Sequence, residues 1–119
     1  MAISILAVDD EQNLLELLLR VLGKKGFVVK TALNAPEALN LIEHESFNLA
    51  LLDIKMGVMN GVRLLKQMKD RWPHIKVIMM TAYPTSETRI EAFENGASAY
   101  LTKPVDLQKL VGTIHSLAH

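Results

Sequence analysis

The sequence predicts an α/β fold in which a five-stranded parallel β-sheet has helices on both of its faces. Short β-branched or leucine-rich runs alternate with longer segments of helical period, and five such pairs follow one another along the 119 residues. The central runs are almost entirely apolar, as expected of strands that are buried on both faces. The expected strands are residues 3–8, 27–32, 49–52, 77–80 and 99–101.

A helix is expected after each strand, because apolar residues recur there at the spacing of one helical face. The second helix has the clearest start, since Glu37 follows Asn34 by three residues, as in a capping box. Pro73 is expected to stop the third helix. The positions expected to face inward in these three helices are Leu14, Leu18, Val21 and Leu22, then Ala38, Leu41 and Ile42, then Leu64, Leu65 and Met68.

The last two helices also carry capping signals. The fourth is expected to begin near Thr85 and to bury Ile90 and Phe93. It should end at Gly96, because glycine suits the left-handed conformation of a helix C-terminus. Asp106 is expected to cap the fifth helix. The apolar side of that helix consists of Leu107, Leu110, Val111, Ile114 and Leu117.

The composition indicates one compact domain over residues 1–119. Lys and Arg number 13 and Asp and Glu also number 13, so no basic surplus favours a nucleic-acid or membrane partner. Cysteine is absent, which excludes disulfides and cysteine-rich zinc sites and is consistent with a reducing compartment. The apolar stretches are interrupted by polar residues, so none reads as a membrane span. We therefore expect a cytoplasmic protein with no nucleic-acid or membrane partner of its own.

Polar residues follow the expected strands at the edge where ligands bind in open α/β sheets. The first strand runs into Asp9-Asp10-Glu11 and the third into Asp53. The fourth strand is followed by Thr81, and the fifth by Thr102-Lys103-Pro104. Because the carboxyl ends of parallel strands meet at one edge of the sheet, these side chains should lie close together.

Carboxylates at one edge repel one another, at roughly 4 kcal/mol for a pair about 4 Å apart in a medium of effective dielectric near 20. A cation should therefore accompany them. Mg²⁺ binds one or two carboxylates while keeping water and phosphate ligands, and a lysine supplies a point charge for a phosphoryl oxygen. The set predicts a metal-assisted phosphoryl site with Asp53 as the nucleophile.

Each of these residues also has a simpler interpretation when it is taken alone. A strand-end aspartate often caps a helix, and the Asp9-Asp10 pair would favour the positive end of a helix dipole. Lys103-Pro104 is a common turn dipeptide, and Thr81 would serve as a cap. Because all of these residues fall at one edge of the sheet, the phosphoryl site is favoured over the separate simpler roles.

These residues strongly resemble the receiver domain of two-component response regulators, over the whole chain from Ile3 to about Leu117. The resemblance lies in four segments with the order and spacing of that family: LAVDDE at 6–11, LLDIKM at 51–56 with MNG at 59–61, MTA at 80–82, and GA at 96–97 with YLTKP at 100–104. The resemblance implies a doubly wound, flavodoxin-like fold with strand order 2-1-3-4-5.

The resemblance further implies that Asp53 accepts a phosphoryl group from a sensor histidine kinase or a histidine phosphotransfer protein. Asp10, Asp53 and the backbone carbonyl of Lys55 would bind Mg²⁺, for which Mn²⁺ is a substitute. Asp9 would act on the metal mainly through water.

A conformational switch is also implied by the resemblance. Lys103 would contact the phosphoryl oxygens, and its peptide bond to Pro104 would be cis. The Thr81 hydroxyl would turn to the phosphoryl group and Tyr100 would swing inward behind it. The altered surface would be residues 86–95, 99–102 and 106–117, facing a downstream output domain or protein or forming a homodimer. The alternative for Tyr100 is that it only covers the edge of the sheet.

Three further features of the sequence lead to expectations of their own. Gly57 stands where the family usually has proline, so we expect a more mobile loop after the third strand. Lys55 and Tyr83 lie two residues after Asp53 and Thr81, and we hypothesise that they shield the aspartyl phosphate and lengthen its lifetime. The leucine-rich first helix is either buried all round or offers a surface to the phosphotransfer helices of a kinase.

Two rival functions share features with this switch. A phosphatase of the haloacid-dehalogenase type also uses a strand-end aspartate and Mg²⁺, but it needs a second aspartate where this chain has Lys55, and it normally has a cap domain. An interaction module that has lost phosphorylation is disfavoured because the site residues are all present. The sequence thus predicts a phosphoacceptor that is not an enzyme, in that it catalyses only its own phosphorylation and dephosphorylation.

Overall fold

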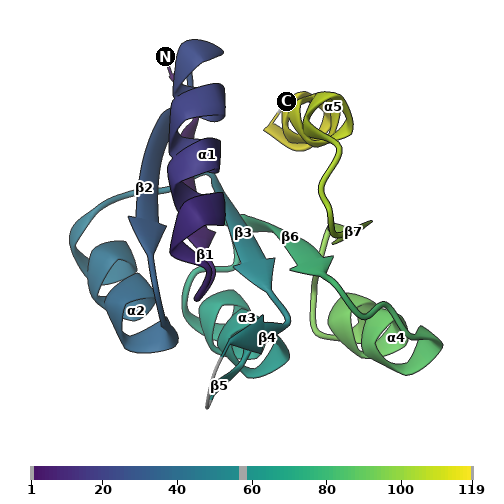
Figure 1. The fold of residues 1–119 in the computed structure, drawn as a ribbon. Coiled ribbons are helices and arrows are strands. Elements are labelled where there is room, and N and C mark those ends of the chain that lie inside the picture. The colour runs from purple at the N-terminus through teal and green to yellow at the C-terminus, as the bar shows by residue number, and fades with distance from the viewer. Residues whose placement is uncertain (1, 57–58, 119) are drawn as a thin grey trace.

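The computed structural model describes residues 2–56 and 59–118, and strands and helices alternate along them (Figure 1). Gly57, where a mobile loop was expected, lies outside the described residues. The strands are β1 (Ser4–Val8), β2 (Val28–Ala32), β3 (Leu49–Asp53), β4 (Lys55–Met56), β5 (Met59–Asn60), β6 (Lys76–Thr81) and β7 (Ala99–Thr102). The helices are α1 (Gln12–Lys24), α2 (Ala35–His44), α3 (Gly61–Arg71), α4 (Ser86–Glu94) and α5 (Leu107–Ala118).

The main sheet has five parallel strands in the order β2-β1-β3-β6-β7. Counted within this sheet alone, the order is 2-1-3-4-5, which confirms the predicted doubly wound fold. A second, two-stranded antiparallel sheet pairs β4 with β5 directly after β3. The sequence did not predict this small sheet, because strands of two residues are too short to show a periodicity.

Helices cover both faces of the main sheet, as predicted. Neighbouring residues of a strand point to opposite faces, so each central strand contributes to two hydrophobic cores. On one face Ile5 and Leu51 pack with α1 and α5, and on the other Leu6 and Leu52 pack with α2, α3 and α4. Figure 1 shows α1 and α5 together on one side of the sheet and the other three helices on the opposite side. The helix residues most deeply buried in these cores are Leu18, Leu22, Ala38, Leu64, Leu65, Met68, Ala92, Leu110 and Ile114.

The expected packing of α4 is wrong. Ile90 and Phe93 are 57% and 41% exposed, and Ala92 is the residue of α4 that is buried. The expected ends are confirmed, since Thr85 is the N-cap and Gly96 has a positive φ of 103°. The spacing of Ile90 and Phe93 does define one helical face, but α4 turns a different face, that of Ala92, toward the sheet.

The buried stripe of α1 is also displaced from the expected one. Leu15, Leu18 and Leu22 are buried, whereas Leu14 and Val21 are half-buried. The sheet therefore does not cover the whole apolar circumference of α1. None of the helices in the described part of the chain is both long and apolar enough to cross a bilayer.

The register of the sheet brings the predicted polar residues to one edge. Val8 is paired with Leu52, Asp53 with Met80, and Thr81 with Thr102. The residues that end or follow β1, β3, β6 and β7 therefore lie side by side at the carboxyl edge of the sheet.

Candidate functional site

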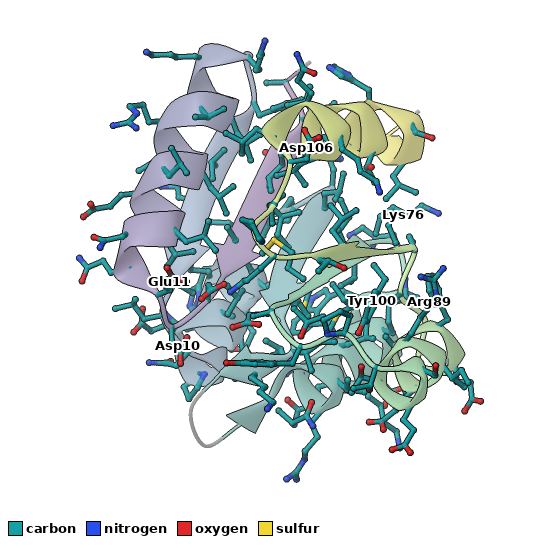
Figure 2. All side chains as sticks on the ribbon, turned by 45° about the vertical axis from the view of Figure 1, so that its right-hand side comes forward. Asp10, Glu11, Lys76, Arg89, Tyr100 and Asp106 are labelled. Atoms are coloured by element: carbon teal, nitrogen blue, oxygen red, sulfur yellow. The ribbon has the colours of Figure 1, made fainter. Side chains whose placement is uncertain are left out.

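Three carboxylates from the ends of two strands meet at this edge. Asp9 and Asp10 follow β1, and Asp53 is the last residue of β3. One carboxylate oxygen of each lies within 4.8 Å of the others. Asp9 and Asp53 are buried, whereas Asp10 is exposed, as Figure 2 shows at the end of the sheet beside Glu11. The cluster thus has two buried oxygen donors and one side that is open to solvent.

Lys103 supplies the positive charge that the structure places against this cluster. Its Nζ lies 2.7 Å from Oδ2 of Asp9, 3.4 Å from Oδ2 of Asp53 and 4.0 Å from Oε2 of Glu11. Burial alone would lower the pKa of the Lys103 ammonium, but its hydrogen bond to Asp9 and the charges of Asp9 and Asp53 raise that pKa above its usual value. Lys103 is therefore a fixed cation at this edge, and its hydrogen bond goes to Asp9.

Asp53 is held in an environment that disfavours its charge. Burial, and then the negative charge of Asp9, raise the pKa of the Asp53 carboxyl above its usual value, although Lys103 and the Lys55 backbone N–H oppose the change. That N–H donates a hydrogen bond of 3.3 Å to Oδ1 of Asp53. The charge of Lys103 thus does not fully compensate the buried acids.

This donor set fits a hard divalent cation. Carboxylate oxygens near one another, one of them facing solvent, are the ligands Mg²⁺ takes while it keeps several waters. A divalent ion would also relieve the uncompensated charge of Asp53. The three aspartates that the sequence predicts as metal ligands, Asp9, Asp10 and Asp53, therefore lie close enough to bind one ion together.

Thr81, the second predicted phosphate contact, lies next to the cluster. Thr81 is buried at the end of β6, and its backbone carbonyl accepts a hydrogen bond of 2.7 Å from the backbone N–H of Lys103. The Thr81 hydroxyl accepts a hydrogen bond of 3.0 Å from the Tyr83 backbone N–H. The Lys103–Pro104 peptide bond is cis. Thr81 and Lys103 are thus tied to each other through the backbone.

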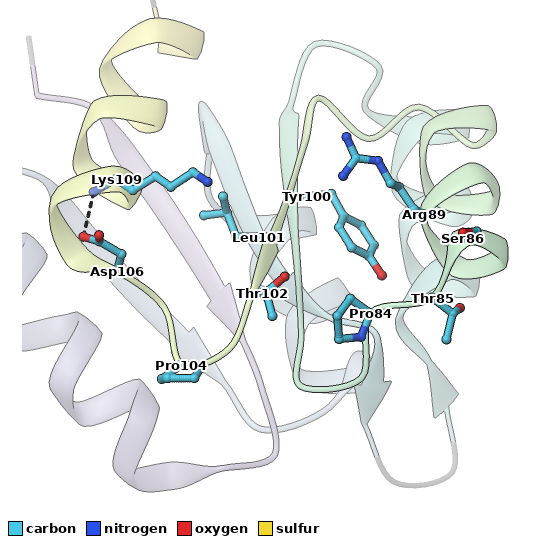
Figure 3. Close-up of a pocket in the computed structure, with 10 residues that line it drawn as sticks. All are labelled: Pro84, Thr85, Ser86, Arg89, Tyr100, Leu101, Thr102, Pro104, Asp106 and Lys109. Carbon is cyan, nitrogen blue, oxygen red and sulfur yellow. Dashed lines mark hydrogen bonds between the residues drawn. The ribbon is translucent and has the colours of Figure 1, made fainter.

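Tyr100 points away from the carboxylates. It is half-buried on β7, and its hydroxyl lies 2.8 Å from the Thr88 hydroxyl of α4. Figure 2 shows Tyr100 and Arg89 together at the edge of the sheet far from α1. The Tyr100 ring lines a cavity of about 460 Å³ between α4 and α5, with Arg89 on one side and Lys109 on the other (Figure 3). The structure therefore places Tyr100 on the predicted output face, in contact with α4.

Gly61 is a site residue whose role the sequence reasoning missed. It begins α3, and its N–H donates a hydrogen bond of 2.7 Å to the carbonyl of Ile54. A Cβ at this position would lie 2.0 Å from the backbone oxygen of Asp53, far closer than any real contact. The start of α3 is therefore packed against the backbone of Asp53, and only glycine allows that approach. The match of Gly61 to the family pattern was the available signal.

Lys55 and Tyr83 form a pair at the rim of the cluster. The Nζ of Lys55 lies 4.8 Å from the centre of the Tyr83 ring, and both side chains are exposed. The contact is a cation–π interaction across two loops, one after β3 and the other after β6. It places an aromatic ring and an ammonium beside the approach to Asp53.

An apolar cavity of about 390 Å³ adjoins Lys103 on the side of α1. Leu14 and Leu17 of α1 line one wall, and Val105 and Leu107 line the other. The half-buried leucines of α1 are therefore part of a surface that leads to the carboxylate cluster.

This fold and this site define a class of signalling domain, and comparison with known proteins agrees. The sequence pattern of the response regulator receiver domain matches residues 5–115. The crystal structure of a CheY-like receiver domain protein from Methanospirillum hungatei JF-1 superposes with a TM-score of 0.96 at 37% identity, covering 99% of this chain and 94% of that one. The chain belongs to the response regulator receiver domain family.

Two further similar proteins extend the comparison. The transcriptional regulatory protein ZraR of Klebsiella oxytoca is 40% identical over 118 residues, which are 98% of this chain and 27% of ZraR. A response regulator from Burkholderia pseudomallei, whose crystal structure has a phosphorylated aspartic acid, a calcium ion and citrate, superposes with a TM-score of 0.90 at 28% identity over 98% of this chain and 68% of that chain.

The chain spans about a quarter of the length of the curated relatives that it matches. Because several of those relatives are named as transcriptional regulators, they give no support to the expectation that nucleic acid is not a partner.

Proposed function

We propose that this chain is a phosphoryl-accepting switch in which Asp53 is the acceptor. The observation that carries the proposal is the meeting of Asp9, Asp10 and Asp53 with Lys103 at the carboxyl edge of the sheet. Membership of the receiver family supports the same function, and it also supports a cytoplasmic location and action of residues 1–119 as one unit.

The proposed reaction is transfer from a phosphohistidine. A carboxylate oxygen of Asp53 attacks the phosphorus, the bond between phosphorus and the histidine nitrogen breaks, and the imidazole leaves with its electron pair and takes up a proton. The product on Asp53 is an acyl phosphate. The desolvated carboxylate is suited to this attack, because it has exchanged part of its hydration for a few fixed contacts.

Asp9, Asp10, Asp53 and the backbone carbonyl of Lys55 are the proposed ligands of Mg²⁺ or Mn²⁺, with Asp9 acting mainly through water. When bound, the ion neutralises charge on the phosphoryl oxygens. Asp10 carries the donor atom at the open side of the cluster, next to the buried acceptor carboxylate of Asp53.

Lys103 and Thr81 are the proposed contacts for the transferred group. Lys103 now donates its hydrogen bond to Asp9, and it lies 3.4 Å from Asp53, so a small movement of Nζ would bring it to a phosphoryl oxygen. The Thr81 hydroxyl would leave the Tyr83 backbone N–H and donate to the phosphoryl group. Tyr100 would then turn inward from α4 toward the space that Thr81 leaves.

The proposed phosphoryl donor is a sensor histidine kinase or a histidine phosphotransfer protein. The apolar cavity between α1 and the loop after Lys103 offers such a partner a docking surface next to the cluster, with Leu14, Leu17 and Leu107 in its walls. This favours the interpretation of α1 as a partner surface over complete burial, because Leu14 and Leu17 are only partly covered by this chain.

The proposed output surface is the face of α4, β7 and α5. Its exposed residues include Ile90 and Phe93, and Arg89 and Lys109 border the cavity beside Tyr100. A downstream output domain or protein, or a second copy of the chain, would bind there. Our proposal is that residues 1–119 do not themselves bind nucleic acid or a membrane.

The test against a phosphatase compares two substrates in the presence of Mg²⁺. The switch takes one phosphoryl group per chain from a small acyl phosphate and does not turn over a phosphomonoester. Steady release of phosphate from the phosphomonoester would favour the phosphatase instead. Lys55, at the position where that class needs an acidic residue, supports the first outcome.

A further inference from the structure

The hydroxyl of Tyr100 forms a hydrogen bond with Thr88 of α4. Its oxygen lies 2.8 Å from Oγ1 of Thr88, twelve residues away in sequence. The ring of Tyr100 packs on the core that contains Ala92 and Ala97, and the Arg89 guanidinium lies 5.8 Å from its centre. In Figure 3 Tyr100 lies beside Arg89 with its hydroxyl toward the start of α4. The outward orientation of Tyr100 is therefore stabilised by packing of its ring and by the hydrogen bond of its hydroxyl.

Thr88 is at the same time part of the cap of α4. The Thr88 backbone N–H donates a hydrogen bond of 3.1 Å to Oγ1 of Thr85, and the Thr85 backbone N–H donates one of 3.3 Å to Oγ1 of Thr88. The Thr88 hydroxyl also donates to the Thr85 carbonyl, at 3.1 Å. This reciprocal capping box fixes the first turn of the helix. One hydroxyl thus serves both the helix start and Tyr100.

The first turn of α4 has little else to hold it. Of the residues of α4, Ala92 is the one that is fully buried, while Ile90 and Phe93 are exposed. A helix with so little buried surface depends on its cap to a greater degree than α3, which buries five residues. A change at Thr88 should therefore reach the exposed face of α4.

We propose that Thr88 is a positioning residue of the switch: its hydroxyl holds Tyr100 outward and links the position of Tyr100 to the first turn of α4. The inference rests on the proposed function, because it names the residue through which Tyr100 acts on the output face. When Tyr100 turns inward, the Thr88 hydroxyl loses its contact with the Tyr100 hydroxyl, and the start of α4 loosens. Conversely, the hydrogen bond lowers the population of the inward state before phosphorylation.

Amide hydrogen exchange on the unphosphorylated chain, without any metal, tests the link directly. Tyr100→Phe removes only the phenol oxygen and should speed exchange at the Thr88 and Arg89 amides about fivefold, which corresponds to one net hydrogen bond of about 1 kcal/mol. Tyr83→Phe, which removes an exposed hydroxyl just before α4, is the matched control and should leave these amides unchanged. Unchanged exchange in Tyr100→Phe would overturn the proposal.

Binding of beryllofluoride with Mg²⁺, as a mimic of the phosphoryl group, tests the effect on the switch. Thr88→Val should tighten binding about fivefold, because the outward state loses its hydrogen bond, whereas Thr88→Ser should retain the wild-type affinity. Thr85→Val weakens the cap but keeps the Thr88 hydroxyl, and should not tighten binding. Equal tightening by Thr85→Val and Thr88→Val, or none by Thr88→Val, would contradict the proposed role of Thr88.

The two measurements separate this inference from the proposed function. If the wild-type chain fails to bind beryllofluoride, the proposed function is wrong, and the exchange measurement still decides whether Tyr100 supports the start of α4. If binding depends on Asp53 but exchange in Tyr100→Phe is unchanged, the function stands and the role of Thr88 falls.

Discussion

The ammonium of Lys103 donates its hydrogen bond to Asp9, at 2.7 Å, and not to the proposed acceptor Asp53, whose nearest oxygen is 3.4 Å away. Asp9 is fully buried and follows β1, whereas Lys103 follows β7, so the bond joins segments 94 residues apart. In this state Lys103 stabilises the buried carboxylates of Asp9 and Asp53. A phosphoryl group on Asp53 would compete with Asp9 for the Lys103 ammonium.

The first prediction concerns the stability that this ion pair supplies. Lys103→Met keeps the aliphatic stem but leaves the Asp9 carboxylate buried without its cation, so it should lower the free energy of unfolding by about 3 kcal/mol. Urea unfolding at neutral pH measures the change. Arg71→Met is the control, because it removes an ion pair with Glu43 that is exposed on both sides and should cost less than about 1 kcal/mol. Equal losses in the two variants would contradict this view of Lys103.

The second prediction concerns charge and metal at Asp53. Because burial and Asp9 raise its pKa, the folded chain binds the Asp53 proton more tightly than the unfolded chain does, and the ionised carboxylate costs stability above that raised pKa. In the presence of a chelator at neutral pH, Asp53→Asn should therefore be more stable than the wild type. The difference should shrink as the pH falls through the raised pKa.

Mg²⁺ should reverse this order. At ten times its dissociation constant it should stabilise the wild type by about 1.4 kcal/mol and should stabilise Asp53→Asn much less. Asp70→Asn, on the exposed side of α3, should respond to Mg²⁺ as the wild type does. The same urea titrations, with and without the ion, provide the comparison. A gain from Mg²⁺ that is equal in Asp53→Asn and the wild type would place the metal elsewhere.

The third prediction concerns the backbone that carries Asp53. Gly61→Ala puts a Cβ against the Asp53 carbonyl oxygen, so either β3 or the start of α3 must move, at a cost of about 3 kcal/mol. Labelling of Asp53 by an acyl phosphate should slow as well. Gly112→Ala, on the exposed side of α5 with no atom near the added Cβ, should instead stabilise the chain by about 1 kcal/mol. Thermal unfolding and a labelling time course check both variants.

The sequence predicts which residues meet at the carboxyl edge of the sheet better than it predicts which helix faces are buried. Alternation of apolar runs with helical segments is enough to bring Asp9, Asp53 and Lys103 to one edge, because parallel strands all end there. Which face of α4 meets the sheet is a different matter. Apolar spacing at Ile90 and Phe93 defines a face, but the short helix buries Ala92 instead.

Contacts between distant segments also required the structure. The choice of Asp9 over Asp53 by Lys103 depends on differences of less than 1 Å, which no spacing rule encodes. The close approach of Gly61 to Asp53 is likewise a matter of tertiary packing. The sequence would be the same if Lys103 bonded Asp53 instead, or if α3 began farther from the backbone of Asp53.

The fourth prediction concerns the lifetime of the aspartyl phosphate. Lys55 and Tyr83 contact each other at the rim of the site, and together they would hinder the approach of water to the phosphorus. Tyr83→Ala should speed dephosphorylation several-fold, whereas Tyr83→Phe, which keeps the ring over Lys55, should not. Loss of label after removal of the phosphoryl donor gives the rate. The same dephosphorylation rate in Tyr83→Ala and in the wild type would contradict the shielding hypothesis.

The central claim is that Asp53 accepts a phosphoryl group with the help of a divalent ion, and intact-mass measurement tests it most directly. The chain is incubated with a small acyl phosphate and Mg²⁺, beside Asp53→Asn and beside a sample with a chelator. We predict one phosphoryl group on the wild type, none on Asp53→Asn and far less without the ion. A wild-type chain that stays unmodified, or an adduct that persists in Asp53→Asn, would contradict the claim.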